Sequence, residues 1–141
     1  MTPLERITAR VNGLGDVNVR GTPLPLLTIA EFFDGNEAVG SIGCNLPGGP
    51  PPSVIRTLCE KIAARDDVKD VRVLVTQFDE PDYWPFSDAI YVMTAAEPED
   101  VWSWFPKELA PDEIFIRLFD DNAFEPYDVP PGTRPIGCWW D

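Results

Sequence analysis

The chain has 141 residues, 44% of them hydrophobic and five of them Trp, so it can bury a core as one domain over residues 1–141 and is not wholly disordered. Its formal net charge of −13 argues against binding to bare nucleic acid or to an anionic membrane, because both are negatively charged. Histidine is absent, which excludes Ser-His-Asp and Cys-His nucleophiles and His-based zinc sites. A basic protein or a metal cation is the more natural partner, unless the acidity only keeps the protein soluble.

The N-terminal residues lack the basic-then-apolar pattern of a secretory signal, and no apolar run reaches the roughly 20 residues that span a bilayer. We therefore expect a cytoplasmic protein. The three cysteines, Cys44, Cys59 and Cys138, are widely spaced without a CxxC pair, so we expect buried, reduced thiols and not a disulfide framework. No motif in the sequence predicts a cofactor.

In chain order, apolar residues at helical spacing predict a short helix over residues 3–12. Thr28 and Glu31 form a capping-box pattern, which predicts a second short helix. A short strand is expected over 41–45, before a connector rich in Pro and Gly. A longer amphipathic helix is predicted from near Pro51 to Ser53 until about Arg65, with two adjacent apolar rows: Val54, Leu58 and Ile62; Ile55, Cys59 and Ala63.

The second half of the chain adds strands and one more helix. Runs rich in β-branched residues predict strands over 71–78 and 89–94. Thr94 and Glu97 form another capping-box pattern, which predicts a helix starting at Thr94 and closed by Pro106. Residues 113–119 fit either a strand or a helix, residues 120–135 read as coil, and residues 135–141 as a final strand.

This order predicts an α+β fold, with an antiparallel sheet and helices on one face. After an N-terminal extension, the predicted elements follow the βαββαβ order of a ferredoxin-like sandwich. A further strand at 113–119 would break that order.

Charge and aromatic rings concentrate in the same half of the chain. Residues 1–70 carry 7 basic and 9 acidic side chains, a net charge of −2, whereas residues 71–141 carry 4 and 15, a net charge of −11. All five Trp and all three Tyr lie in that second half. Acidic and aromatic side chains together favour a contact surface for a basic partner over a reaction centre.

The loop over 79–88 is the main candidate for that surface. Its carboxylates Asp79, Glu80 and Asp82 suit Arg or Lys of a partner, and Tyr83 and Trp84 suit the anchoring role of interface aromatics. The alternative is that Trp84 and Phe86 fold back onto the core while the acids are merely solvated. We predict no metal site, because the loop lacks a calcium-loop pattern and its two prolines, Pro81 and Pro85, limit how tightly it can wrap an ion.

Two pairs of tryptophans cannot share one environment. On a helix, Trp102 and Trp104 point about 200° apart, and Trp104 groups with the apolar stripe, so Trp102 should be exposed or covered by the C-terminal segment. On a strand, Trp139 and Trp140 face opposite sides of the sheet. The side without helices must then be covered by a second copy, by a partner, by the N-terminal extension or by the 120–135 coil.

Three strings resemble those of a small bacterial family of uncharacterised proteins: Glu31 to Asn36 (EFFDGN), Trp84 to Asp88 (WPFSD) and Gly137 to Asp141 (GCWWD). Since that family has no assigned activity, the resemblance implies no catalytic residue. In size, acidity and Trp content the chain also bears a looser similarity to immunity proteins of bacterial toxin systems.

Three functions compete on these grounds. The first is a protein-binding module, of inhibitor or immunity type, that uses Asp79, Glu80, Asp82, Tyr83, Trp84 and Trp102. The second is a homo-oligomer that buries an open sheet face. The third is a small-ligand-binding protein, or an enzyme that uses carboxylates, with a pocket walled by Trp and Tyr.

Overall fold

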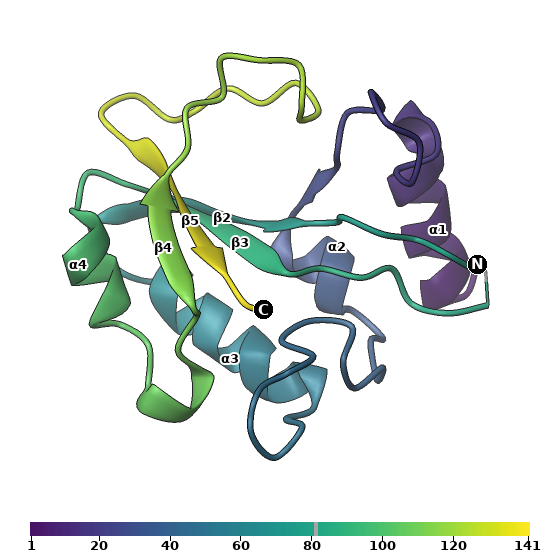
Figure 1. Cartoon of the computed structure of the whole chain (residues 1–141), viewed down its shortest axis with the longest axis horizontal. Helices are drawn as coiled ribbons and strands as arrows, with labels where there is room; N and C mark the ends of the chain where they lie inside the picture. The colour runs from purple at the N-terminus through teal and green to yellow at the C-terminus, as the bar shows by residue number, and fades with distance from the viewer. Residues whose placement is uncertain (81) are drawn as a thin grey trace.

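The computed structural model describes residues 1–80 and 82–141 and confirms an α+β fold with an antiparallel sheet. Five strands form one sheet in the order β1-β2-β3-β5-β4, and every neighbouring pair is antiparallel (Figure 1). The elements are α1 (Pro3–Val11), η1 (Asn12–Leu14), β1 (Leu26–Leu27), α2 (Ile29–Phe33), α3 (Pro52–Ala63), β2 (Val68–Leu74), β3 (Ala89–Thr94), α4 (Pro98–Trp102), η2 (Lys107–Leu109), β4 (Glu113–Ile116) and β5 (Arg134–Trp139).

Side chains cap the first turns of α1 and α2, whereas α3 begins after Pro51 without a side-chain cap. Thr28 and Glu31 form the predicted capping box at the start of α2. The predicted cap at Thr94 is wrong, because α4 starts four residues later, with Glu97 and Asp100 in the capping positions. Thr94 is instead the last residue of β3, and its hydroxyl donates to the carbonyl oxygen of Asp67.

One face of the sheet packs on the helices and forms the main core. Alternate strand residues point to this face, as the twofold period of a strand requires. The indole of Trp140 lies among them, 2% exposed, and its Nε1 donates to the carbonyl oxygen of Leu109 at 3.0 Å. The strand side chains of this core are Leu27, Val68, Val71, Val73, Ile90, Val92, Ile136 and Cys138, and Val75 and Trp140 join them just beyond β2 and β5.

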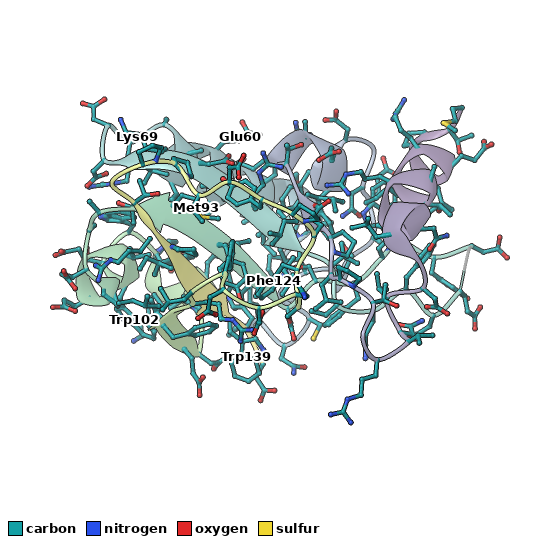
Figure 2. The ribbon with its side chains drawn as sticks, turned by 90° about the horizontal axis from the view of Figure 1, so that it is seen from above. Glu60, Lys69, Met93, Trp102, Phe124 and Trp139 are labelled. Carbon is teal, nitrogen blue, oxygen red and sulfur yellow. The ribbon has the colours of Figure 1, made fainter. Side chains whose placement is uncertain are left out.

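The chain's own coil covers the opposite face. The segment between β4 and β5 crosses the sheet on the side away from α3 (Figure 1). Phe119, Phe124 and Tyr127 from this segment pack with Tyr91 and Trp139 in a second apolar cluster, and Figure 2 shows Phe124 and Trp139 on this side. The opposite facing of Trp139 and Trp140 is thus confirmed. An open sheet face no longer argues for a homo-oligomer, which stays a prediction.

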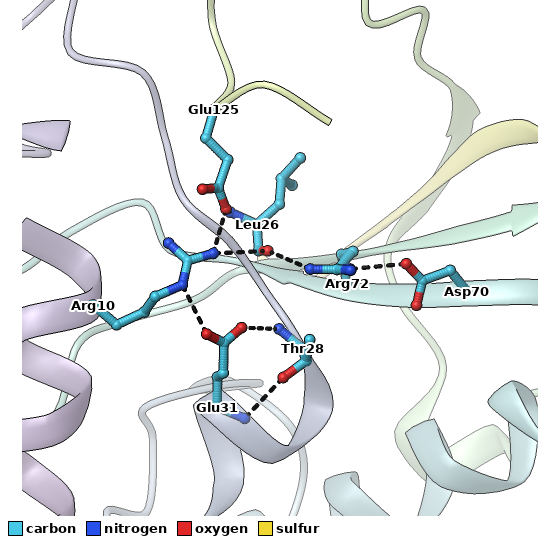
Figure 3. A network of polar contacts seen from close by, with 7 residues as sticks. All are labelled: Arg10, Leu26, Thr28, Glu31, Asp70, Arg72 and Glu125. Atoms are coloured by element: carbon cyan, nitrogen blue, oxygen red, sulfur yellow. Dashed lines mark hydrogen bonds and ion pairs between the residues drawn. The ribbon is translucent and has the colours of Figure 1, made fainter. Parts of the chain in front are cut away.

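A polar network fastens this coil to the rest of the molecule (Figure 3). The Arg10 guanidinium on α1 donates to Glu31 at 2.8 Å and to Glu125 of the coil at 2.5 Å. Glu125 also accepts from the backbone N–H of Leu26 at 2.6 Å, and the carbonyl oxygen of Leu26 accepts from Arg72 at 3.3 Å. The network therefore joins α1, α2, β1, β2 and the coil, and it explains why 120–135 holds its place without regular structure.

Apart from β1, which forms where no strand was predicted, two segments differ from the predicted order. Residues 41–45 form no strand; Ile42 makes one isolated bridge to Ser87. Gly40 and Gly43 have φ values of +88° and +62°, which interrupt an extended backbone. Residues 113–116 form β4, a strand between α4 and β5, as the competing arrangement anticipated. The βαββαβ order is therefore changed at both places.

Candidate functional site

The predicted loop lies at the α1 end of the molecule, between β2 and β3 (Figure 1). Backbone bonds between Gln77 and Phe86 close its base. The indole Nε1 of Trp84 donates to the carbonyl oxygen of Phe32 at 3.0 Å, and the ring packs against the main core. Phe86 is half-buried. Trp84 therefore serves to dock the loop on α2, as the alternative reading of its ring expected.

The other predicted residues of the loop face solvent. Asp79, Glu80 and Asp82 are exposed, and the side chain of Tyr83 is 67% exposed. A small hollow of about 250 Å³ lies here, lined by Gln77, Asp79, Glu80, Tyr83, Trp84 and Phe86. Pro81 lies outside the described residues. Three free carboxylates beside one exposed ring form an acidic patch with room for a basic side chain.

Trp102 lies at the opposite end of the molecule from this loop (Figures 1 and 2). Its side chain is 45% exposed, so the expectation that it stands apart from the helix stripe is confirmed, while cover by the C-terminal segment is wrong. The six predicted residues thus divide between two surfaces, five in the loop and Trp102 on α4. Both surfaces belong to the acidic second half of the chain, so their positions in the sequence did not reveal that they lie far apart in space.

A groove runs between α4 and β4, with a volume of about 410 Å³. Its lining residues are Pro98, Glu99, Trp102, Asp112, Glu113 and Ile114. Asp112 is engaged, because its carboxylate accepts from the backbone N–H of Asp141 at 2.7 Å. Glu99 and Glu113 are exposed and take part in none of the ion pairs of the described residues. The groove is therefore apolar at Trp102 and Ile114 and negative along its rim.

Among the described residues, β4 is the last strand of the sheet and pairs on one side only, with β5. If the register of β4 and β5 is continued by one residue, Arg117 lies opposite Pro135. The N–H of Arg117 donates to the carbonyl oxygen of Pro135. Since backbone groups alternate along a strand, those of Glu113 and Phe115 also point to β5. The N–H and C=O groups of Ile114 and Ile116 then point away from β5, and Ile114 lines the groove. This open edge was not predicted, because residues 113–119 were ambiguous between strand and helix.

Burial changes the pKa of several groups among the described residues. Burial raises the pKa of Asp88, whose carboxylate accepts from the indole of Trp139 at 3.2 Å. Asp88 lines none of the hollows described above. Burial also raises the pKa of the Cys59 thiol to about 12 and that of Cys138 further, whereas Cys44 is exposed, contrary to expectation. These thiols are reduced and the buried two are unsuited to act as nucleophiles.

Two features are absent from the described part of the chain. No group of three or more His, Cys, Asp or Glu side chains there is placed to hold a metal ion. In residues 1–80 and 82–141, no helix combines the length and apolar character needed to cross a bilayer.

Comparison with known proteins gives a family but no activity. The sequence model of the uncharacterized protein YfbO family matches residues 2–138. A protein of Escherichia coli strain K12 described as "Uncharacterized protein YfbO" is 49% identical over 141 residues, which is 100% of both chains. No solved structure matches the chain. The resemblance to a small uncharacterised bacterial family is confirmed, and the chain belongs to the YfbO family.

Proposed function

We propose that this chain is a protein-binding module that takes up an extended, basic segment of a partner as an added strand on β4. The observation that carries the proposal is the unpaired outer edge of β4, which lies beside exposed Trp102 and the free carboxylates of Glu99 and Glu113. Strand addition obtains affinity from main-chain hydrogen bonds and specificity from side chains at alternate positions. The backbone groups of Ile114 and Ile116 supply the main-chain hydrogen bonds, and the groove contacts the partner's side chains and so supplies specificity.

Charge favours a basic partner over a second copy of this chain. A second copy would bring another net charge of −13 to the same edge, whereas Lys or Arg would meet Glu99 and Glu113. Exposed ion pairs contribute only about 0.2–1 kcal/mol each, so these carboxylates serve mainly to steer and select the partner. Burial of the Trp102 ring and the main-chain bonds would supply most of the affinity.

The loop patch is a second contact for the same class of partner. Asp79, Glu80, Asp82 and Tyr83 are exposed together at the far end, and Trp84 holds the loop in place. An inhibitor or immunity-type role is one form that such binding takes. The proposal includes the cytoplasmic location expected from the sequence.

A direct test uses a short capped peptide of alternating Lys and Val and its acidic twin of alternating Glu and Val. Titration of the full chain, followed by calorimetry, should show binding of the basic peptide alone, weakened by added salt. Trp102→Ala should weaken that binding about tenfold or more, as expected for an interface anchor. The control is Val39→Ala, which removes an exposed apolar side chain that lines neither the α4–β4 groove nor the loop hollow and should leave the affinity unchanged.

A backbone variant tests strand addition itself. Ile116→Pro removes an outward N–H that β5 does not use, so the edge should still fold but lose one hydrogen bond to the peptide. Ile116→Thr keeps the N–H and should bind like the parent chain. Equal binding of both peptides, or full binding by Trp102→Ala and Ile116→Pro, would contradict the proposal. Loss of binding in Tyr83→Ala alone would move the contact to the loop.

A further inference from the structure

A second, larger groove lies between α3 and the segment that follows α4, and the proposed function does not use it. Its volume is about 640 Å³, within the range of small-molecule sites in proteins. Ten residues line it: Ser53, Val54, Thr57, Leu58, Lys61, Ser103, Trp104, Phe105, Pro106 and Leu109. The α4–β4 groove described above has no lining residue in common with it.

The floor of this groove is apolar and fixed. Leu58, Phe105 and Leu109 belong to the main core and are 6%, 8% and 8% exposed. The guanidinium carbon of Arg65 lies 3.9 Å from the centre of the Trp104 ring, a cation–π contact that holds this wall in position. Val54, expected to lie in an apolar helix row, is instead 41% exposed at the rim. The groove therefore offers a preformed apolar surface that the described chain leaves uncovered.

One charge marks the groove, and it is positive. Lys61 is the single ionisable side chain among the lining residues, in a protein with a net charge of −13. It is exposed and takes part in none of the ion pairs of the described residues. The three hydroxyls of the lining, on Ser53, Thr57 and Ser103, can also meet polar atoms at the rim. An apolar bed with one ammonium at its side is complementary to a molecule with an apolar body and one negative end.

We propose that the groove between α3 and the 103–109 segment binds a small amphipathic carboxylate. The apolar body of the ligand lies on Val54, Leu58 and Phe105, and its carboxylate meets the ammonium of Lys61. This site goes beyond the proposed function, because it uses another surface and selects the opposite charge. It requires no change of the fold, since the floor side chains are already packed.

The probe is a series of linear carboxylates from hexanoate to decanoate, each kept below its micelle concentration and titrated into the full chain. Affinity should rise about fourfold for each CH₂ that enters the groove. Decanol, which lacks the charge, should bind about two- to fivefold more weakly than decanoate, and decylamine should bind more weakly still. Equal affinity for decanoate and decanol, or no saturable binding of either, would overturn the proposal.

Two substitutions separate the charge from the apolar contact. Lys61→Met keeps the apolar stem and should lower decanoate affinity about two- to fivefold while leaving decanol unchanged. Lys69→Met, on an exposed lysine of β2, is the matched control and should bind like the parent chain. Val54→Glu places a carboxylate at the rim and should abolish decanoate binding. Unchanged binding in both Lys61→Met and Val54→Glu would overturn the assignment, as would preference for a basic amphipathic helix over decanoate.

Failure of this site is distinguishable from failure of the proposed function. Saturating decanoate should leave the affinity for the Lys-Val peptide unchanged, because the two grooves share no lining residue. A chain that binds the peptide but no carboxylate would retain the proposed function and lose this site. The reverse result would retain this site alone.

Discussion

Gly35 gives the sharpest test of how α1 and α2 are packed together. Its φ is +76°, and a Cβ placed on it would lie 2.4 Å from Cβ and 2.6 Å from Cγ of Pro3, the first residue of α1. Gly48 has the same φ of +76°, but nothing lies within 4 Å of the corresponding Cβ position. The two glycines therefore share the backbone conformation and differ in their surroundings.

The cost of Gly35→Ala follows from two contributions. A left-handed backbone costs an L residue about 1–2 kcal/mol, and this contribution applies equally to Gly48→Ala. The contact with the rigid Pro3 ring forces α1 to shift, for which overpacking costs of about 1–3 kcal/mol are typical. We expect Gly35→Ala to lower the free energy of unfolding by about 2–5 kcal/mol, and Gly48→Ala by about 1–2 kcal/mol.

Urea unfolding of both variants measures this difference. The double variant Pro3→Gly/Gly35→Ala removes the clashing ring atoms. Relative to Pro3→Gly alone, it should cost no more than Gly48→Ala does. Equal destabilisation by Gly35→Ala and Gly48→Ala in the parent chain would refute the packing of α1 against the end of α2.

Two further outcomes follow from burial. Asp88 has a raised pKa in the folded chain, so its carboxyl favours folding at low pH, and this contribution is lost as the pH rises through the folded pKa. Asp88→Asn keeps an acceptor for Trp139 and should raise stability at pH 7 but not at pH 3; an equal gain at both would be contrary to this reasoning. A thiol reagent should label Cys44 rapidly in the native chain, and Cys59 and Cys138 only after unfolding, because both are buried and the pKa of Cys59 is raised to about 12. Native labelling of all three would contradict the described core.

Local patterns in the sequence predicted much of the fold. Helical spacing and the Thr28–Glu31 capping box identified α1, α2 and α3 within a few residues of their ends. The period of a strand separated Trp139 from Trp140 correctly. These features depend on neighbours along the chain, which is why the sequence alone reveals them.

Features that depend on distant contacts were not predictable. Thr94 matched a capping pattern, but pairing with β2 and β5 keeps it in a strand. The place of the 120–135 coil depends on Glu125 meeting Arg10, which lies 115 residues away in the sequence. The groove beside β4 likewise exists only because α4 packs near an edge strand that local pattern left ambiguous.

The residues of the candidate site divide in the same way. Exposure of Asp79, Glu80, Asp82 and Tyr83 was foreseeable from their polarity and from a loop between two strands. The sequence left open whether Trp84 faces a partner or folds back onto the core. The hydrogen bond from its indole to the carbonyl oxygen of Phe32 shows that it folds back. Grouping Trp102 with the loop relied on composition, which carries no spatial information.

The proposed function depends most directly on the outer edge of β4, and amide exchange measured residue by residue by NMR tests that edge. In the free chain, Phe115 should exchange slowly and Ile114 and Ile116 rapidly, since their N–H groups point to opposite sides. Addition of the Lys-Val peptide should slow exchange at Ile114 and Ile116 at least tenfold, whatever change it causes in the loop over 79–88. Protection confined to that loop, or unchanged exchange at Ile114 and Ile116 with the peptide bound, would contradict strand addition at β4.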